Sequence, residues 1–175
     1  MTQWFMLTVV GQDQPGIVAK ITTALYEANC LLGEASMMLL GGNFTIMLMV
    51  KSEQDAKTLM ALLQPVAESL NLRIHLDAIE GQLHHHHLPD VAVHVHSADR
   101  AGIVAQVTNT LAEAGLNVID LDSDVGGDED NPFYVMHIEG QATQGIAALE
   151  TALQQLLTTQ PDLEVHITPI ETAIM

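Results

Sequence analysis

Apolar residues change their spacing several times along the chain, and each change marks the start of a predicted element. Residues 3–10 alternate in polarity, which predicts a strand with one buried face. Between residues 17 and 28 the apolar positions recur every three or four residues, which predicts an amphipathic helix. The predicted elements of this half are strand 3–10, helix 17–28, strands 31–41 and 43–50 around the hairpin signal Gly41-Gly42-Asn43, helix 53–69 and strand 72–79.

The same order returns in the second half because the chain is duplicated. Residues 13–28 align with residues 99–114 at an offset of 86, and nine of these sixteen positions are identical. One repeat of this length indicates two copies of a small domain rather than a solenoid. The fold class is therefore predicted as α+β, with two tandem ferredoxin-like βαββαβ domains built on antiparallel sheets. The expected domains are residues 1–80 and 90–175, separated by a linker at 81–89 that contains His84-His85-His86-His87.

Each domain is expected to bury its own core. The core positions come from the alternating strands and from the stripe on the first helix of each copy. The methionines of the hairpin strands favour an adaptable core as well. The expected core residues are Phe5, Leu7, Val9, Ile17, Val18, Ile21, Leu25, Ala28, Met37, Met38, Met47 and Met49 in the first domain, and Val91, Val93, Val95, Ile103, Val104, Val107, Leu111 and Ala114 in the second.

Charge excludes one class of function. The formal net charge is −17, and it is unevenly divided. Residues 1–83 hold four basic and eight acidic side chains, whereas residues 90–175 hold Arg100 alone against fourteen acidic ones. Because neutralisation of phosphates supplies most non-specific affinity for nucleic acid, the sequence predicts no direct DNA or RNA binding.

Cysteine content and hydropathy indicate the compartment. A single cysteine, Cys30, cannot form an intramolecular disulfide and suits a reducing environment. No apolar stretch reaches the roughly 18 residues that a membrane span needs, and the N-terminus lacks the pattern of a signal peptide. We therefore expect a soluble, cytoplasmic protein without membrane contact.

The repeated segment includes a loop that suits a small zwitterionic ligand. In Asp13-Gln14-Pro15-Gly16 the glycine lacks a Cβ, so a ligand can approach the backbone closely. The first N–H groups of the following helix favour a carboxylate, and Asp13 can hold an ammonium group or cap the helix. The alternative is that the loop only starts the helix, as capping sequences commonly do.

With this loop in a βαββαβ unit, each half resembles the ACT domain, a regulatory module that binds amino acids. Two such units without an attached enzyme resemble the glycine cleavage system transcriptional repressor family. The resemblance covers essentially the whole chain and implies a ligand where the loop meets a strand of a neighbouring unit. The ligand-binding residues implied are Asp13, Gln14, Pro15, Gly16 and Ile17 in the first copy and Asp99, Arg100, Ala101, Gly102 and Ile103 in the second.

The two copies depart from the family pattern in different places, so their sites are not expected to be equivalent. Ala101 stands where the family prefers proline, and Arg100 replaces Gln14. The family's Gly-x-Asn-Ile segment after the first helix is nearly intact at residues 115–118, which makes Asn117 a candidate ligand contact.

Nine histidines in an acidic chain raise a metal hypothesis. His94 and His96 alternate with buried valines and face away from the helices, His166 occupies the same face of the last strand, and His137 can join them. Imidazoles two apart on a strand can meet a transition metal. The alternative is a polar face that is solvated or packs in a dimer, and no metal ligand is predicted.

No catalytic or cofactor-binding motif is present, so no catalytic residue and no cofactor are predicted. The first hypothesis is a non-enzymatic regulatory protein that senses an amino acid, with glycine and serine as first candidates. It would act on transcription through a protein partner such as a transcription factor, and as a homodimer. The alternatives are a protein-interaction module without a small ligand and a metal-binding protein that uses His94, His96 and His166.

Overall fold

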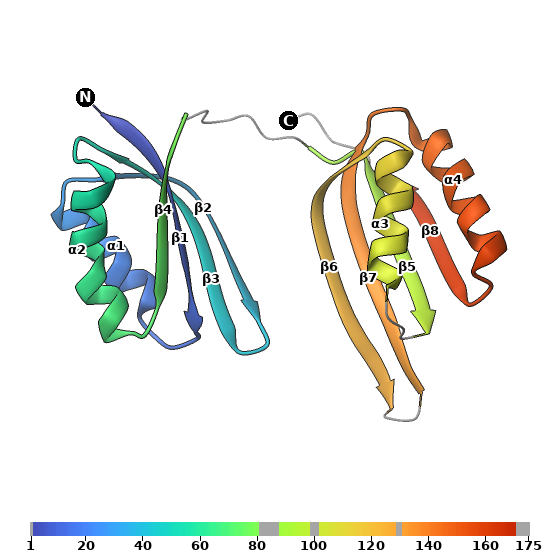
Figure 1. Ribbon diagram of the computed structural model, residues 1–175, viewed down its shortest axis with the longest axis horizontal. Helices are drawn as coiled ribbons and strands as arrows, with labels where there is room; N and C mark the ends of the chain where they lie inside the picture. The colour runs from blue at the N-terminus through green and yellow to red at the C-terminus, as the bar shows by residue number, and fades with distance from the viewer. Residues whose placement is uncertain (1, 81–87, 99–101, 129–130, 171–175) are drawn as a thin grey trace. The chain divides into compact units, whose positions relative to one another are not determined.

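The computed structural model describes residues 2–80, 88–98, 102–128 and 131–170. The chain divides into two compact units, residues 1–85 and 86–175, each of which is described by itself (Figure 1). Most of the predicted linker, including His84 to His87, lies outside the described residues. None of the described helices is long and apolar enough to span a membrane.

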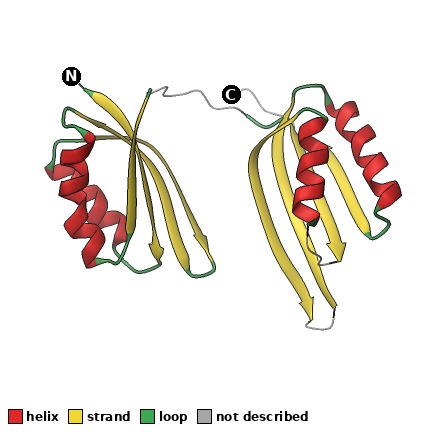
Figure 2. Ribbon diagram, in the orientation of Figure 1, coloured by secondary structure: helices red, strands yellow, loops and turns green. Residues whose placement is uncertain are grey.

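Both units have the predicted βαββαβ order, with two helices on one face of a four-stranded antiparallel sheet (Figures 1 and 2). The strand orders are β2-β3-β1-β4 and β6-β7-β5-β8. The predicted fold class is therefore confirmed. The elements are β1 Gln3–Gln12, α1 Ile17–Glu27, β2 Leu31–Leu40, β3 Asn43–Ser52, α2 Ala56–Ser69 and β4 Arg73–Ile79 in the first unit, and β5 Val91–Ala98, α3 Ile103–Glu113, β6 Leu116–Asp128, β7 Asn131–Ala142, α4 Ile146–Thr159 and β8 Leu163–Pro169 in the second.

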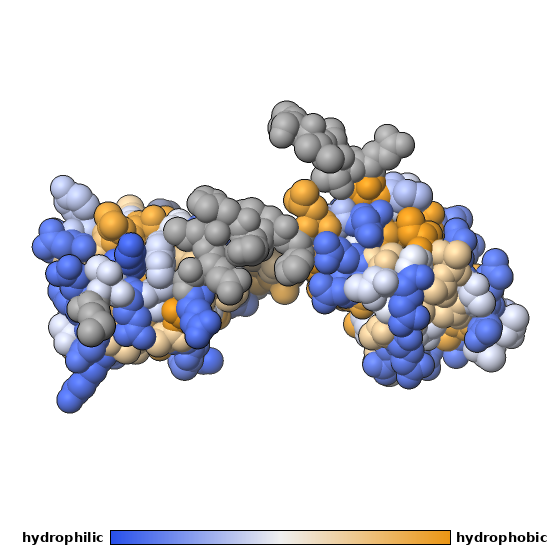
Figure 3. Space-filling view, turned by 90° about the horizontal axis from the view of Figure 1, so that it is seen from above, coloured by the Kyte–Doolittle hydropathy of each residue, from blue (hydrophilic) through white to orange (hydrophobic). Residues whose placement is uncertain are grey.

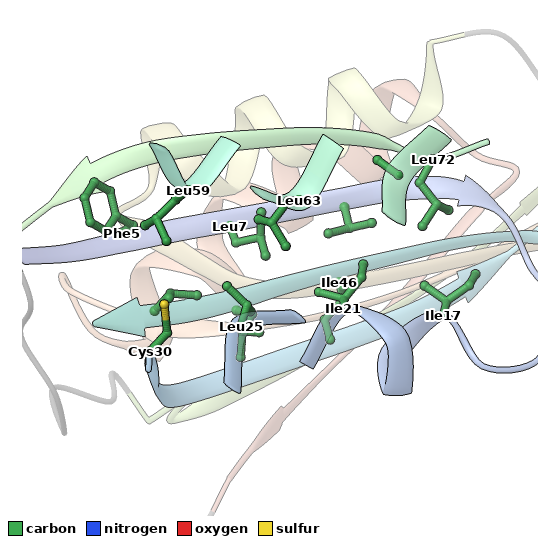
Figure 4. Close-up of a cluster of buried hydrophobic side chains, with 14 of the residues drawn as sticks. Phe5, Leu7, Ile17, Ile21, Leu25, Cys30, Ile46, Leu59, Leu63 and Leu72 are labelled. Atoms are coloured by element: carbon green, nitrogen blue, oxygen red, sulfur yellow. The ribbon is translucent and has the colours of Figure 1, made fainter. Parts of the chain in front are cut away.

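The core of the first unit lies between the sheet and its helices (Figure 4). Leu7 of β1 pairs with Leu48 of β3 and Leu76 of β4, which places three apolar side chains in one row across the sheet. Leu25 of α1 and Leu59 of α2 are fully buried against this face. Each such side chain contributes roughly 1.5–3 kcal/mol by its removal from water.

The second unit repeats this arrangement with smaller strand residues. Val91, Val93 and Val95 are buried on β5 as predicted, and Leu111 of α3 occupies the position of Leu25. Met136 and Ile138 of β7 are also fully buried, as are Val107 of α3 and Leu149 of α4. Each unit thus has a separate hydrophobic core.

The predicted burial of Val18 and Val104 is wrong. These two residues are 39% and 37% exposed, whereas Ile17 and Ile103 beside them are buried. The cause is geometric, because each step along a helix rotates the side chain by about 100°, and only one of two neighbouring positions can face the sheet. The exposed valine occurs at the same place in both copies.

The predicted burial of the methionines is wrong at three of four positions. Met37, Met38 and Met47 are about half exposed, and only Met49 is buried. Every residue of β2 is exposed because β2 is an edge strand. Figure 3 shows apolar residues at the surface of the molecule. Exposed apolar side chains line β2, whose outer edge pairs with no other described strand.

The side chain of Asp55 caps the start of helix α2, and its contribution to the stability of the first unit can be measured. The Thr58 N–H donates to Asp55 Oδ1 at 2.8 Å. Hydrogen bonding to the Thr58 side chain and then to its backbone holds the pKa of Asp55 below the usual 3.8. A lowered pKa means that the stabilisation is complete above pH 3.8 and is lost as the pH falls through the lower, folded value.

We expect Asp55→Ala to lower the thermal midpoint of the first unit by a few degrees at neutral pH, because an N-cap acceptor is lost. Asp55→Asn should retain most of the cap, since asparagine also accepts the N–H. Thermal unfolding followed by circular dichroism, at neutral pH and well below pH 3.8, measures both effects. An Asp55→Ala deficit that is unchanged at the lower pH would contradict the assignment.

Candidate ligand-binding site

The loop between β1 and α1 reaches the helix through a left-handed glycine. Gly16 has φ 90° and ψ 2°, and its carbonyl accepts from Lys20 N as the first hydrogen bond of α1. Gly102 has nearly the same conformation in the second copy, with φ 89° and ψ −3°. A side chain would strain the backbone at either position. Both copies therefore have glycine at this position because both have the same left-handed backbone conformation there.

The N–H groups at the start of α1 and α3 are not capped by a side chain within the described residues. Helix α2, in contrast, has its cap on Asp55. The expectation that Asp13 caps α1 is therefore wrong. The left-handed Gly16 occupies the N-cap position, and the backbone N–H of Asp13 donates to Gly42 O at 3.0 Å, which ties the loop to the β2–β3 hairpin. The first turn of α1 thus keeps free donors and a partial positive charge.

Gln14 has a contact that the sequence did not reveal. Its Nε2 donates to Leu70 O at 2.8 Å, so the side chain bridges the loop to the end of α2. The contact holds the loop against the helical layer. This makes Gln14 a positioning residue whose amide N–H₂ already has a partner.

The loop lines a surface cavity of about 270 Å³ in the first unit. Four of the five predicted residues of this copy border the cavity, and Pro15 does not. The hairpin supplies an apolar wall that sequence reasoning missed. The cavity is lined by Asp13, Gln14, Gly16, Ile17, Val18, Ala19, Met37, Leu39 and Phe44.

The alternation of β2 contains a signal for this wall. Met37 and Leu39 are two apart, and Leu39 pairs with Phe44, which places all three on one face of the hairpin. The exposed Val18 also borders the cavity, in agreement with its position outside the core.

Gly102 and Ile103 begin α3 as expected, while Asp99, Arg100 and Ala101 lie outside the described residues. The strand register identifies the residues of the second unit that correspond to the hairpin wall.

Phe44 pairs with Gly11 and Leu39, and Tyr134 pairs with Ser97 and Val125. Since Ser97 follows Gly11 by the repeat offset of 86, Tyr134 corresponds to Phe44 and Val125 to Leu39. By the same register Ser123 stands at the position of Met37. The second copy is therefore more polar at two of the three wall positions.

The structure does not bring Asn117 to Gly102 within the second unit. Asn117 pairs with Gln141 near the start of β5, whereas Gly102 follows the end of β5. The two residues thus lie at opposite ends of the sheet, and of α3, whose eleven residues span about 16 Å. Asn117 and Gly102 of one unit do not contact one small ligand.

A larger hollow, of about 620 Å³, lies elsewhere, between α3 and α4. Its lining includes Thr110, Glu113, Gln144, Ala148 and Gln155. The first turn of α4 borders this hollow through Ala148, but the repeated glycine loop does not. The smaller cavity beside Gly16 has the chemistry of a ligand site because it combines a carboxylate, free helix N–H groups and an apolar wall.

Comparison with known proteins agrees with the two-unit structure. Residues 3–77 match one ACT-domain family model and residues 91–158 match another. The UPF0237 protein YjhC of Lactococcus lactis is 37% identical over 82 residues, which are 45% of this chain and 94% of that protein. The glycine cleavage system transcriptional repressor of Escherichia coli is 24% identical over 160 residues, which cover 89% of this chain and 84% of the repressor.

Two solved structures share the fold over nearly the whole chain. A protein of unknown identity from Galdieria sulphuraria has a TM-score of 0.78 at 21% identity, with 98% of this chain and 100% of that chain covered. A protein provisionally described as a glycine cleavage system transcriptional repressor has a TM-score of 0.72 at 19% identity, with 98% and 99% covered.

Proposed function

Because the chain belongs to the ACT-domain family, with one such domain in each half, we propose that it is a non-enzymatic regulatory protein that senses an amino acid. The observation that carries the proposal is the β1–α1 loop. There a left-handed Gly16, an uncapped helix start and the carboxylate of Asp13 border one cavity. The left-handed glycine recurs in the second copy, where none of the described side chains caps the start of α3.

The cavity assigns a role to each part of the ligand. The ligand carboxylate lies at the first N–H groups of α1, where the helix dipole favours an anion. The ligand ammonium pairs with Asp13, and its side chain contacts Met37, Leu39 and Phe44. This wall favours an aliphatic amino acid in the first copy. Ser123 and Tyr134 at the corresponding positions make glycine or serine the better candidates for the second.

We propose that the response acts on transcription through a protein partner such as a transcription factor. The relationship to the Escherichia coli repressor supports the regulatory role, and the net charge of −17 disfavours direct contact with DNA. The open edge of β2 suits pairing with a second molecule of the protein, since the N–H and C=O groups of an edge strand are available for hydrogen bonds with another strand. On this proposal the protein works in the cytoplasm as a homodimer.

A second candidate is a protein-interaction module without a small ligand. The exposed apolar side chains of β2, among them Leu31, Leu39 and Leu40, favour it. In that case β2 is a docking strand, and the β1–α1 loop is only structural.

Isothermal titration of tag-free protein with each of the twenty amino acids distinguishes the two candidates. We expect saturable binding of at least one amino acid, and no binding of its carboxamide, which lacks the carboxylate needed at the helix start. At a ligand concentration of 100 times Kd, the unfolding free energy should rise by about 2.7 kcal/mol. Flat titrations across the set would favour the interaction module.

A further inference from the structure

The open face of the second sheet carries a row of potential metal ligands. His137 of β7 pairs with His94 of β5, and His94 pairs in turn with His166 of β8. Asp122 of β6 stands opposite His137. One row across all four strands therefore reads Asp122, His137, His94, His166 on the face away from α3 and α4. This row belongs to the second unit, shares no residue with the cavity beside Gly16 and is not needed for the proposed function.

Two of these imidazoles have ring nitrogens close enough together to bind one metal ion. His137 Nδ1 and His94 Nδ1 are 3.1 Å apart. Two bonds of about 2.0–2.1 Å to nitrogens at this separation enclose an angle of roughly 95–100° at a metal, between the octahedral and tetrahedral values. The two ring centroids are 4.5 Å apart, with an interplanar angle of 39°. This distance is too short for the two Nδ1 atoms to point directly at each other along the line between the rings. The nitrogens can therefore converge on a common point beside the pair.

A carboxylate fixes which nitrogen of His137 is available. Glu139 Oε1 lies 3.2 Å from His137 Nε2. Because a carboxylate only accepts, Nε2 carries the hydrogen, and in neutral His137 the lone pair is on Nδ1, facing His94. Without metal, His94 Nδ1–H can donate to this lone pair. On metal binding, His94 changes to its Nε2–H tautomer, so both Nδ1 atoms become ligands.

We propose that His94 and His137 form the core of a site for a borderline divalent transition metal ion such as Zn²⁺. In the described parts of the chain, no three His, Cys, Asp or Glu side chains already converge on one point. The third ligand therefore has to rotate in, and Asp122 and His166 flank the pair on the neighbouring strands with exposed side chains. The excess of acidic groups in this half raises the local concentration of cations.

The first copy is a natural control for this site. The equivalent row there reads Ser36, Met47, Thr8, His75, so only one of its four positions is a histidine. His75 instead contacts its own strand neighbour Asp77 at 3.0 Å. The pair of adjacent histidines, His94 and His137, therefore occurs in the second unit and has no equivalent in the corresponding row of the first.

The test uses the full chain with His84 to His87 replaced by serine, because that run binds metals by itself. We expect one equivalent of Zn²⁺ per chain in competition with a chromogenic chelator, and a Co²⁺ complex with visible absorption. Glu139→Gln should weaken the affinity by about 10–100-fold, as loss of an outer hydrogen-bond partner does. His94→Ala and His137→Ala should each weaken it further, and His75→Ala should have no effect.

Circular dichroism checks that each variant remains folded, which the exposure of His94 favours. Stoichiometric binding that survives in the His94→Ala, His137→Ala double variant would overturn the proposal. The absence of binding in the parent chain with the serine linker would overturn it as well. Neither result bears on amino-acid binding, which is measured separately at the β1–α1 loop.

Discussion

Replacement of Gly16 by valine is expected to abolish amino-acid binding to the first copy. A Cβ at this position meets no atom of the described residues within 4 Å, so the new side chain occupies the open space in front of α1. That space is where the proposed ligand carboxylate lies. The free protein should remain folded, because the direct cost is left-handed backbone strain of about 1–2 kcal/mol.

Titration calorimetry with the amino acid that binds the wild type measures this effect, and Gly102→Val tests the second copy in the same way. Gly145→Val is a control at a glycine outside the repeated loop. Gly145 precedes α4 with φ 87° and ψ 155°, a Cβ there also meets nothing within 4 Å, and the residue does not line the cavity beside Gly16. Because its ψ differs from that of Gly16, circular dichroism is used to check that this variant is folded. The proposed site would be excluded if the Gly16→Val, Gly102→Val double variant bound amino acid as tightly as the wild type.

Replacement of Leu111 by alanine is expected to destabilise the second unit by about 2–5 kcal/mol, the usual range for a fully buried leucine. Leu111 is 0% exposed and lies in the last turn of α3, within the core of the second unit. Leu25→Ala is the corresponding change in α1 and should destabilise the first unit by a similar amount. Since each unit has its own core, we expect each variant to shift one unfolding transition and leave the other nearly unchanged.

Val104→Ala is the surface control in the same helix as Leu111. Its side chain is 37% exposed, so the free energy of unfolding should change by no more than about 0.5 kcal/mol. Hydrogen exchange followed by mass spectrometry reports the two units separately, because protection is read segment by segment. Equal loss of protection in both units after Leu111→Ala would show that their stabilities are coupled.

The element order and the fold class followed from the sequence because apolar spacing fixes which face of an element is buried. Phe5, Leu7 and Val9 share a face by alternation, and Ile21 and Leu25 by helical spacing, and all five are buried. The exact ends of the strands could not be predicted from this spacing. β1 continues to Gln12 because Gln12 pairs with Asn43 at the hairpin tip, and that contact depends on the register of two distant segments.

The candidate site was only partly predictable for the same reason. The glycine loop was visible from its repetition, but its apolar wall belongs to β2 and β3 and depends on hairpin register. The exposure of Met37 could not be read from its hydrophobicity, because it results from the edge position of β2. Asn117 and Gly102 lie at opposite ends of the second sheet, which depends on strand pairing and not on sequence proximity, and the role of Asn117 as a ligand contact stays a prediction.

The rows through Thr8 and His94 differ between the two copies on the open face of each sheet. Both copies retain the left-handed glycine, yet three of the four residues in these rows differ. A side chain on an open sheet face can be exchanged without disturbing the core beneath it. One chain thus carries two copies of a fold with similar cores and with different chemistry on their open sheet faces.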